Sequence, residues 1–373
     1  MFRTISHKKV VCSAARRFFV TGEEFAKAHA SPRRPINILF FGSSDVAIPT
    51  LVELNKARQP GYAGNAEPLV DRLEVVVPPL KTRGKKLELK ASDVETAAID
   101  LGLPIHRLAT GTKFRMQGFQ LPPGPFDLGI VISFGYMLRP EVIDTFPMGM
   151  INAHASLLPA LRGAAPIQYA LLRGLSETGV TVTTLHPTTI DAGRVLHSAP
   201  IPIPPRATFA TLAPAVAACA ADSVLHVLRN WDDIALHSLE QSQLPGADSV
   251  PAELRNAPKI TKADGVVHWA SMSAREVAGR WQGLTGFTPV FCTFAGKRME
   301  LLDVEEDASA TDSEDMQPGE FLFDAARAAL VVQCRSGRVL VRRLQLECKK
   351  ACSARDFANG HLLKRGLTRD HFQ

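Results

Sequence analysis

The sequence lacks several features that would place it in a common class at once. It has no stretch of about 20 uninterrupted apolar residues, the length that a membrane-spanning helix needs. Its six cysteines are scattered without a CxxC pair, which favours free thiols in a reducing compartment over a disulfide framework. Cys348 and Cys352 stand without a second cluster, so no metal site is predicted. No internal repeat is visible.

Two catalytic signatures are also missing. The first apolar segment, 36–42, leads into SSDVA and not into a GxGxxG loop. No GxSxG elbow surrounds Ser156. These absences argue against a dinucleotide cofactor and against a serine nucleophile at that position.

What the chain does have is length and a segregated charge. Its 373 residues suffice for two domains, and 46% apolar with 21% charged residues is typical of a soluble globular protein. The net charge of +6 is carried by the two ends. Residues 1–35 hold eight basic against two acidic side chains, and 331–373 hold ten against three. A basic C-terminal end predicts a polyanionic partner held there.

The basic N-terminus has a separate interpretation. It contains no acidic residue before Glu23 and interleaves Arg and Lys with Ser, Thr and apolar residues. This composition is typical of a mitochondrial transit peptide, and a disordered basic tail is the alternative. Residues 1–35 are therefore predicted to be a disordered or cleaved leader, which indicates the mitochondrial matrix.

The order of the apolar segments predicts the fold of the first domain. Short apolar strands alternate with helical segments such as SDVETAAIDLG (92–102) and PEVIDTF (140–146). This alternation favours an α/β fold, a mostly parallel, doubly wound, Rossmann-like sheet with both faces covered. The expected strands are 36–42, 73–78, 126–135 and 149–155, with a shorter one at PIHRL.

The pattern changes after the helical segment 207–229. A polar, Pro-containing stretch, 241–258, reads as a linker between a catalytic domain at 36–240 and a second domain at 259–373. That second domain shows short alternating strands, GVVHW among them, joined by Gly-containing turns, which predicts a small OB-like β-barrel. The acidic stretch 305–315 is expected to be a solvated loop.

Asn152 and His154 stand two residues apart at the end of a predicted strand. Residues i and i+2 of a strand project from the same face, and the carboxyl ends of parallel strands border the ligand crevice of such sheets. The Asn amide can donate to a developing oxyanion, and the imidazole can move a proton near neutral pH. Asp191, in a predicted tight turn, suits a residue that orients the histidine. The grouping suggests direct group transfer, whereas Asn-x-His alone is more often structural.

Taken together, these residues resemble the formyltransferases that use 10-formyltetrahydrofolate. The likeness is carried by Asn152-x-His154, SLLP (156–159), RGAAPIQ (162–168), TGVT (178–181) and Asp191-x-Gly193. It implies that Asn152, His154 and Asp191 are catalytic, and that two loops line the folate site. The implied folate-binding residues are Ser156, Leu157, Leu158, Pro159, Phe134, Gly135, Tyr136 and Leu138.

Two further stretches resemble the branch of this family that acts on methionyl-tRNA. KTRGKKLELKAS (81–92) is similar to its basic insertion loop, and 257–269 with 349–360 are similar to its C-terminal tRNA-contacting barrel. The resemblance implies initiator Met-tRNA as partner, no metal, and tRNA contacts through Arg83, Lys85, Lys86, Arg342, Arg343, Lys349 and Lys350. Ser44 and Val46 depart from the family's first turn. The chain carries no oligomer signal, so a monomer is the default expectation.

Two other functions stay open from the sequence. One is a folate-dependent formyltransferase that acts on another amine or an amino sugar, with the barrel serving a different purpose. The other is a non-catalytic RNA-binding protein on the same scaffold, against which the intact Asn, His and Asp trio argues.

Overall fold

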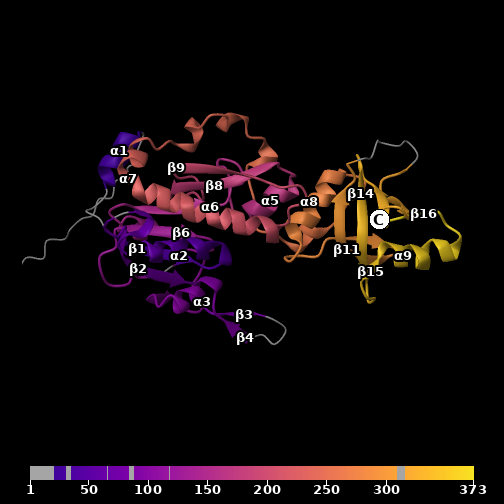
Figure 1. Cartoon of the computed structure of the whole chain (residues 1–373), viewed down its shortest axis with the longest axis horizontal. Helices are drawn as coiled ribbons and strands as arrows, with labels where there is room; N and C mark the ends of the chain where they lie inside the picture. The colour runs from indigo at the N-terminus through magenta and orange to yellow at the C-terminus, as the bar shows by residue number, and fades with distance from the viewer. Residues whose placement is uncertain (1–20, 31–34, 65, 84–87, 117, 309–315) are drawn as a thin grey trace, which may run out of the picture.

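A seven-stranded sheet forms the first domain of the computed structural model, which describes residues 21–30, 35–64, 66–83, 88–116, 118–308 and 316–373 (Figure 1). The strand order is β5-β2-β1-β6-β7-β8-β9, in which the pairs from β5 to β7 are parallel and β8 and β9 are antiparallel. The predicted mostly parallel α/β fold is therefore confirmed. The strands are β1 (Ile36–Gly42), β2 (Val70–Val77), β5 (Ile105–Arg107), β6 (Leu128–Ile132), β7 (Met150–His154), β8 (Glu177–Thr184) and β9 (Val195–Pro202).

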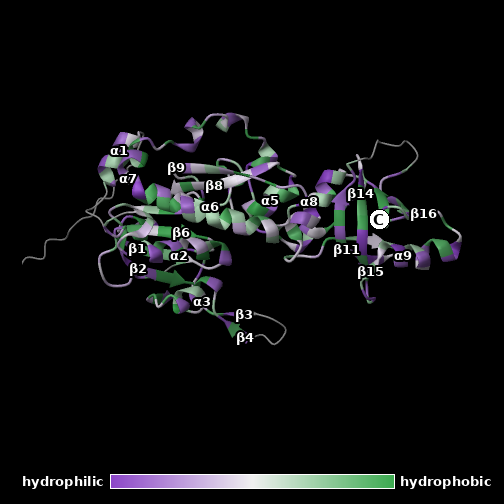
Figure 2. Cartoon of the chain, viewed as in Figure 1, coloured by the Kyte–Doolittle hydropathy of each residue, from purple (hydrophilic) through white to green (hydrophobic). Residues whose placement is uncertain are grey.

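The sheet is buried on both faces at β1, which explains why residues 38–42 of this strand form a continuous apolar run. Ile38 and Phe40 enter the core on one face, whereas Leu39 and Phe41 enter a second core on the other. Figure 2 shows hydrophobic residues along β2 and mixed hydrophobic and hydrophilic residues along the helices. The covering helices are α2 (Ile48–Lys56), α3 (Asp93–Asp100), α4 (Pro140–Ile143), α5 (Pro166–Leu172), α6 (Phe209–Arg229) and α7 (Trp231–Leu236).

Helix α6 is long and apolar enough to cross a membrane by length and composition, and 61% of its most apolar window is buried in the domain. Its core-facing side includes Val216, Ala220, Val224 and Leu228, each at most 2% exposed. The i, i+4 spacing of these residues makes a continuous apolar stripe that packs on the sheet. The apolar composition of α6 is thus accounted for by its place in the core.

The second domain is an antiparallel sheet in the order β10-β11-β14-β13-β12-β16, with β15 paired to β14. Backbone hydrogen bonds in both directions join Thr293 of β10 to Gln373, which follows β16, at 2.8 and 2.7 Å. They close the curled sheet, so the prediction of a small barrel is confirmed. Its elements are β10 (Phe291–Phe294), β11 (Lys297–Glu306), β12 (Glu320–Asp324), β13 (Ala329–Gln333), β14 (Arg338–Leu346), β15 (Cys352–Ser353), β16 (Arg369–His371), α8 (Ala274–Leu284) and α9 (Ala354–His361).

Two local expectations for this domain are wrong. GVVHW forms only an isolated bridge, Val266 to Phe291, because Val267 and Trp269 are buried in a turn that leads into α8. The acidic stretch is not a loop from its start, since Glu305 and Glu306 belong to β11. Residues 309–315 lie outside the described residues.

The segment 241–258 is attached to the first domain at both of its ends. It consists of the 3₁₀ turns η3 (Gln241–Gln243), η4 (Ala247–Ser249) and η5 (Ala252–Leu254). Backbone hydrogen bonds join Leu161 to Leu254 at 2.7 Å and Arg162 to Arg255 at 3.0 Å. A third runs from the Ala257 N–H to the Arg162 carbonyl at 2.7 Å. This stretch is a strap laid over the domain.

Part of the predicted leader is also packed on the domain. Helix α1 (Gly22–Ala28) has a capping box between Thr21 and Glu24, and it lies beside α7 (Figure 1). The Phe25 side chain is 4% exposed, and the Trp231 indole N–H donates to the His29 carbonyl at 2.8 Å. Residues 21–30 are therefore part of the fold.

Compared with deletion of residues 1–20, deletion of residues 1–30 is expected to lower the free energy of unfolding by about 2–4 kcal/mol. The second deletion removes the buried Phe25 side chain and the hydrogen bond from Trp231. These contribute about 1.5–3 and 0.5–1.5 kcal/mol to stability. Thermal unfolding of the two truncations and of Phe25→Ala measures this. Equal melting temperatures for both truncations would contradict it.

Candidate active site

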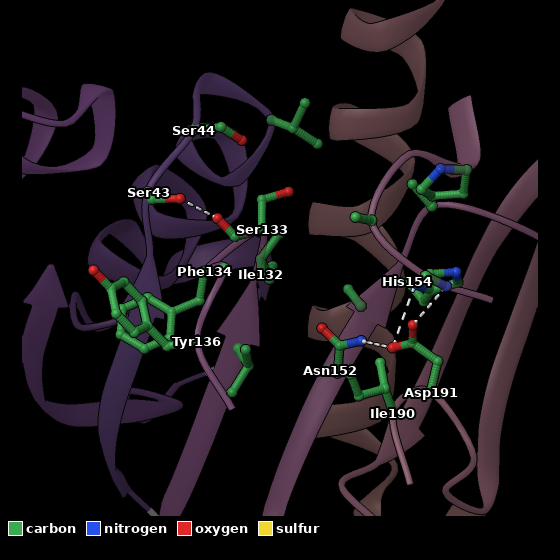
Figure 3. A pocket seen from close by; sticks show the side chains of 18 of the residues that line it. Ser43, Ser44, Ile132, Ser133, Phe134, Tyr136, Asn152, His154, Ile190 and Asp191 are labelled. Carbon is green, nitrogen blue, oxygen red and sulfur yellow. Dashed lines mark hydrogen bonds and ion pairs between the residues drawn. The ribbon is translucent and has the colours of Figure 1, made fainter. Parts of the chain in front are cut away.

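The carboxyl end of β7 carries the two residues that the sequence analysis singled out. Asn152 pairs with Val131 of β6 and Thr183 of β8, and His154 pairs with Thr181 of β8. Their positions two apart on one strand put both side chains on the same face, where both contact Asp191 (Figure 3).

Asp191 reaches this strand from the turn after β8. The Asn152 amide donates to its Oδ1 at 3.2 Å, and His154 Nδ1 lies 3.5 Å from the same oxygen. Oδ2 accepts from the backbone N–H of Gly163 at 3.0 Å. Asp191 has a φ of 51°, a left-handed conformation that an Asp tolerates in tight turns. The structure thus brings together the three residues predicted to be catalytic.

The imidazole of His154 lies between two hydrogen-bond acceptors. Its Nε2 is 2.9 Å from the Leu161 carbonyl oxygen, and its Nδ1 faces the Asp191 carboxylate. A carbonyl and a carboxylate only accept, so a ring nitrogen that carries a hydrogen can donate to the group that it faces. With a side chain 6% exposed, His154 is held in one orientation.

A cavity of about 740 Å³ opens in front of this trio. It lies beyond the carboxyl ends of β1, β6 and β7, where the strand order of the sheet reverses direction from β1. One wall is the loop after β6. The hydroxyl of Ser43, which follows β1, donates a hydrogen bond to the carbonyl of Ser133 in this loop. The predicted residues Phe134, Gly135, Tyr136 and Leu138 all line it, as do Ser44 and Val46.

The SLLP turn does not line this cavity. The Ser156 hydroxyl donates to the Ala160 carbonyl at 2.6 Å, and Leu158 N–H donates to Thr181 Oγ1 at 3.0 Å. Both Ser156 and Leu158 are buried. The turn that follows β7 is thus fixed by its own hydrogen bonds and directs the chain away from the sheet. It consists of Ser156, Leu157, Leu158 and Pro159.

Two aromatic residues of the cavity have no signal in the sequence. Phe209 opens α6 and Phe287 follows α8, so one comes from each domain. Their rings meet edge to face with centroids 4.5 Å apart, and Phe287 is 51% exposed. Neither position belongs to a motif, and only the docking of the two domains brings them together.

The predicted tRNA-binding residues fall into three groups. Arg83 ends β3 (Lys81–Arg83) of a hairpin with β4 (Glu88–Lys90) that projects from the catalytic domain, while Lys85 and Lys86 lie outside the described residues (Figure 1). Arg343, Lys349 and Lys350 are exposed on the barrel. Arg342 instead bonds Glu305 of the neighbouring strand, which makes it the least available of the set.

The five cysteines in the described part of the chain are free thiols, as predicted. Burial raises the pKa of Cys292 and of Cys334 to about 12, so both stay protonated at neutral pH. Among the described residues no group of three His, Cys, Asp or Glu side chains is placed to hold a metal ion.

Comparison with known proteins identifies the family of the chain. Residues 119–228 match the formyl transferase family, and residues 259–362 match the formyl transferase C-terminal domain. A methionyl-tRNA formyltransferase of Sorangium cellulosum is 31% identical over 88% of this chain and 98% of its own length. The chain belongs to the formyl transferase family.

Two more similarities place the chain within that family. The mitochondrial methionyl-tRNA formyltransferase of Homo sapiens is 28% identical over 91% of this chain and 81% of its own length. The crystal structure of WlaRD, a sugar 3N-formyl transferase, shares the fold with a TM-score of 0.54 at 13% identity, covering 85% of this chain and all of that one. The chain therefore has a formyl transferase fold, and its family membership shows a transferase enzyme.

Proposed function

We propose that this protein transfers the formyl group of 10-formyltetrahydrofolate to the α-amino group of methionyl-initiator-tRNA in mitochondria. The observation that carries the chemistry is the meeting of Asn152, His154 and Asp191 at the floor of the cavity. Its relatives named methionyl-tRNA formyltransferases, of mitochondria and of bacteria, support the acceptor.

The cavity fits the proposed formyl donor. A pterin is a flat heteroaromatic ring system with polar edges, and the wall at Phe134, Tyr136 and Leu138 offers apolar side chains to its faces. When bound, the folate supplies the formyl carbon, and its N10 leaves with the bonding electron pair as the amine nitrogen forms the new C–N bond.

The trio divides the work on that carbon. Asn152 uses one amide hydrogen on Asp191 and keeps the other for the formyl oxygen, on which negative charge develops. His154, when it is protonated, adds positive charge beside that oxygen. Asp191 holds both side chains and is the group placed to accept the amine's proton, which N10 ultimately receives.

The tRNA is proposed to lie along the basic side of the barrel and the β3–β4 hairpin. Exposed cations at Arg343, Lys349 and Lys350, with Lys364 and Arg365 after α9, suit phosphate oxygens. Contacts of this kind weaken with salt by about 0.7–0.9 in log K per phosphate for each tenfold rise in salt concentration. The acceptor end would then pass Phe287 into the cavity.

The mitochondrial location rests on the basic, acid-poor leader and on the mitochondrial relatives. We place the enzyme in the matrix, where the leader would direct it. Because α1 is packed on the domain, cleavage of the leader is proposed to fall before Thr21, so that the mature enzyme retains the helix.

A formylation assay tests the proposal. Purified enzyme with 10-formyltetrahydrofolate is expected to formylate charged initiator tRNA, with KM for tRNA rising steeply with salt and KM for folate changing little. A dTDP-amino sugar and free methionine are offered in parallel. Faster transfer to the sugar nucleotide would replace the acceptor, and no transfer to any amine would favour the RNA-binding alternative.

A further inference from the structure

One buried side chain, Gln241 at the start of the strap, contacts both halves of the active site. It is 4% exposed. Its amide Nε2 donates to the backbone carbonyls of Asp191 at 2.8 Å and Gly193 at 3.0 Å. Its Oε1 accepts from Nε of Arg162 at 3.0 Å and from a terminal guanidinium nitrogen of the same residue. All the hydrogen-bonding capacity of the amide is thus turned toward two loops.

Arg162 is the residue between two direct contacts of the trio. The carbonyl of Leu161, before it, accepts from His154, and the N–H of Gly163, after it, donates to Asp191. Fixing the Arg162 side chain therefore fixes the segment that supports the imidazole and the carboxylate from one side. Gln241 supplies that anchor.

The Asp191 turn needs an anchor on its other side. Asp191 has a left-handed φ of 51°, which is less stable than the common conformations. Gly193 lies so close to β8 that a Cβ there would be 1.7 Å from the Thr184 carbonyl oxygen. Two donated hydrogen bonds from Gln241 hold this tight turn in place, and Arg194 is held to Ser238 and Glu240 next to it.

We infer that Gln241 is a positioning residue for formyl transfer, which holds the 161–163 and 191–193 loops at the separation that the catalytic trio requires. This inference rests on the proposed function for its reaction. A displacement of about 1 Å in such a site costs up to about 10²-fold in rate. Loss of this clamp, the hydrogen bonds of Gln241 to both loops, would therefore appear in kcat, because Gln241 does not line the cavity.

The test replaces Gln241 by Met, which has nearly the same volume and makes none of these hydrogen bonds. We expect kcat to fall about 10- to 100-fold with KM for folate and tRNA within about threefold. Gln241→Glu keeps the acceptor for Arg162 but sets a carboxylate against two carbonyls, so it is expected to lose at least as much. A normal kcat for Gln241→Glu would overturn the two-sided clamp.

The chain offers a matched control in the barrel. Gln333 is 5% exposed, donates from Nε2 to the carbonyls of Cys334 and Gly337 at 3.0 and 3.2 Å, and accepts from Arg338 Nε at 3.1 Å. Gln333→Met therefore removes equivalent bonds far from the trio. It should match Gln241→Met in lost thermal stability while keeping the wild-type kcat.

The outcomes separate cleanly. Equal kcat in Gln241→Met and Gln333→Met, or a loss explained by a smaller folded fraction, would overturn the inference. If Gln241→Met does not fold, Arg162→Met removes one half of the clamp from the other side, and a kcat reduced by less than about threefold would count against it. The wild type, assayed alongside, reports on the proposed function, whereas only the ratio of variant to wild type reports on Gln241.

Discussion

Replacement of Asn152 by alanine is expected to lower kcat for formyl transfer by about 10²- to 10³-fold. Removal of one preorganised donor to a developing oxyanion has an effect of this size in a site shielded from water. KM for both substrates should change little, because the donor acts on charge that appears in the transition state. Single-turnover formylation with saturating folate and charged tRNA measures the chemical step directly.

Two further variants decide how the loss arises. Asn152→Asp keeps the shape but places a carboxylate within about 3 Å of Asp191, so it is expected to be at least as inactive. Asn55→Ala, in α2 and outside the cavity lining, where the side chain accepts from Arg58, should behave as wild type. An Asn152→Ala enzyme with more than about a tenth of wild-type kcat would exclude the oxyanion role.

Phe321→Ala is expected to have the largest effect on stability, a loss of about 3–5 kcal/mol in the barrel. Phe321 is fully buried at the centre of an aromatic cluster. Its ring stacks on Phe372 with centroids 4.2 Å apart and lies 6.0 Å from both Phe294 and Phe357. Truncation leaves a cavity that rigid aromatic neighbours fill poorly.

Chemical denaturation measures that loss when it is followed by a spectroscopic signal that reports on the barrel domain, because the two domains need not unfold together. Phe323, half-buried on the same strand, provides the comparison and should lose less when truncated. A destabilisation by Phe321→Ala below about 1 kcal/mol would mean that the cluster repacks around the gap.

Where the sequence predicts the structure, local pattern and tertiary packing agree. The continuous apolar run of β1 predicts a strand buried on both faces, and the spacing of Asn152 and His154 predicts a shared face. Asp191 is identifiable because an Asp before a small residue and Gly marks a turn, although its distance from the histidine is a property of the fold alone.

The remaining features depend on contacts between segments far apart in the chain. Phe209 and Phe287 meet only because the domains dock, and nothing in the composition of 241–258 distinguishes a linker from a strap. Helix α1 is not predicted from the sequence, because it lies within a basic segment and the residues of its capping box, Thr21 and Glu24, are also common in loops. Its place in the fold depends on the burial of Phe25. Gln241 belongs to no motif, and the role inferred for it depends on its hydrogen bonds to residues far away in the sequence.

The backbone hydrogen bonds between Thr293 and Gln373 that close the barrel have a practical consequence. Phe372 is fully buried, and Gln373 supplies the backbone groups that join β10. Loss of these two residues would remove an aromatic side chain from the core and leave the edge of β10 open to pair with another chain.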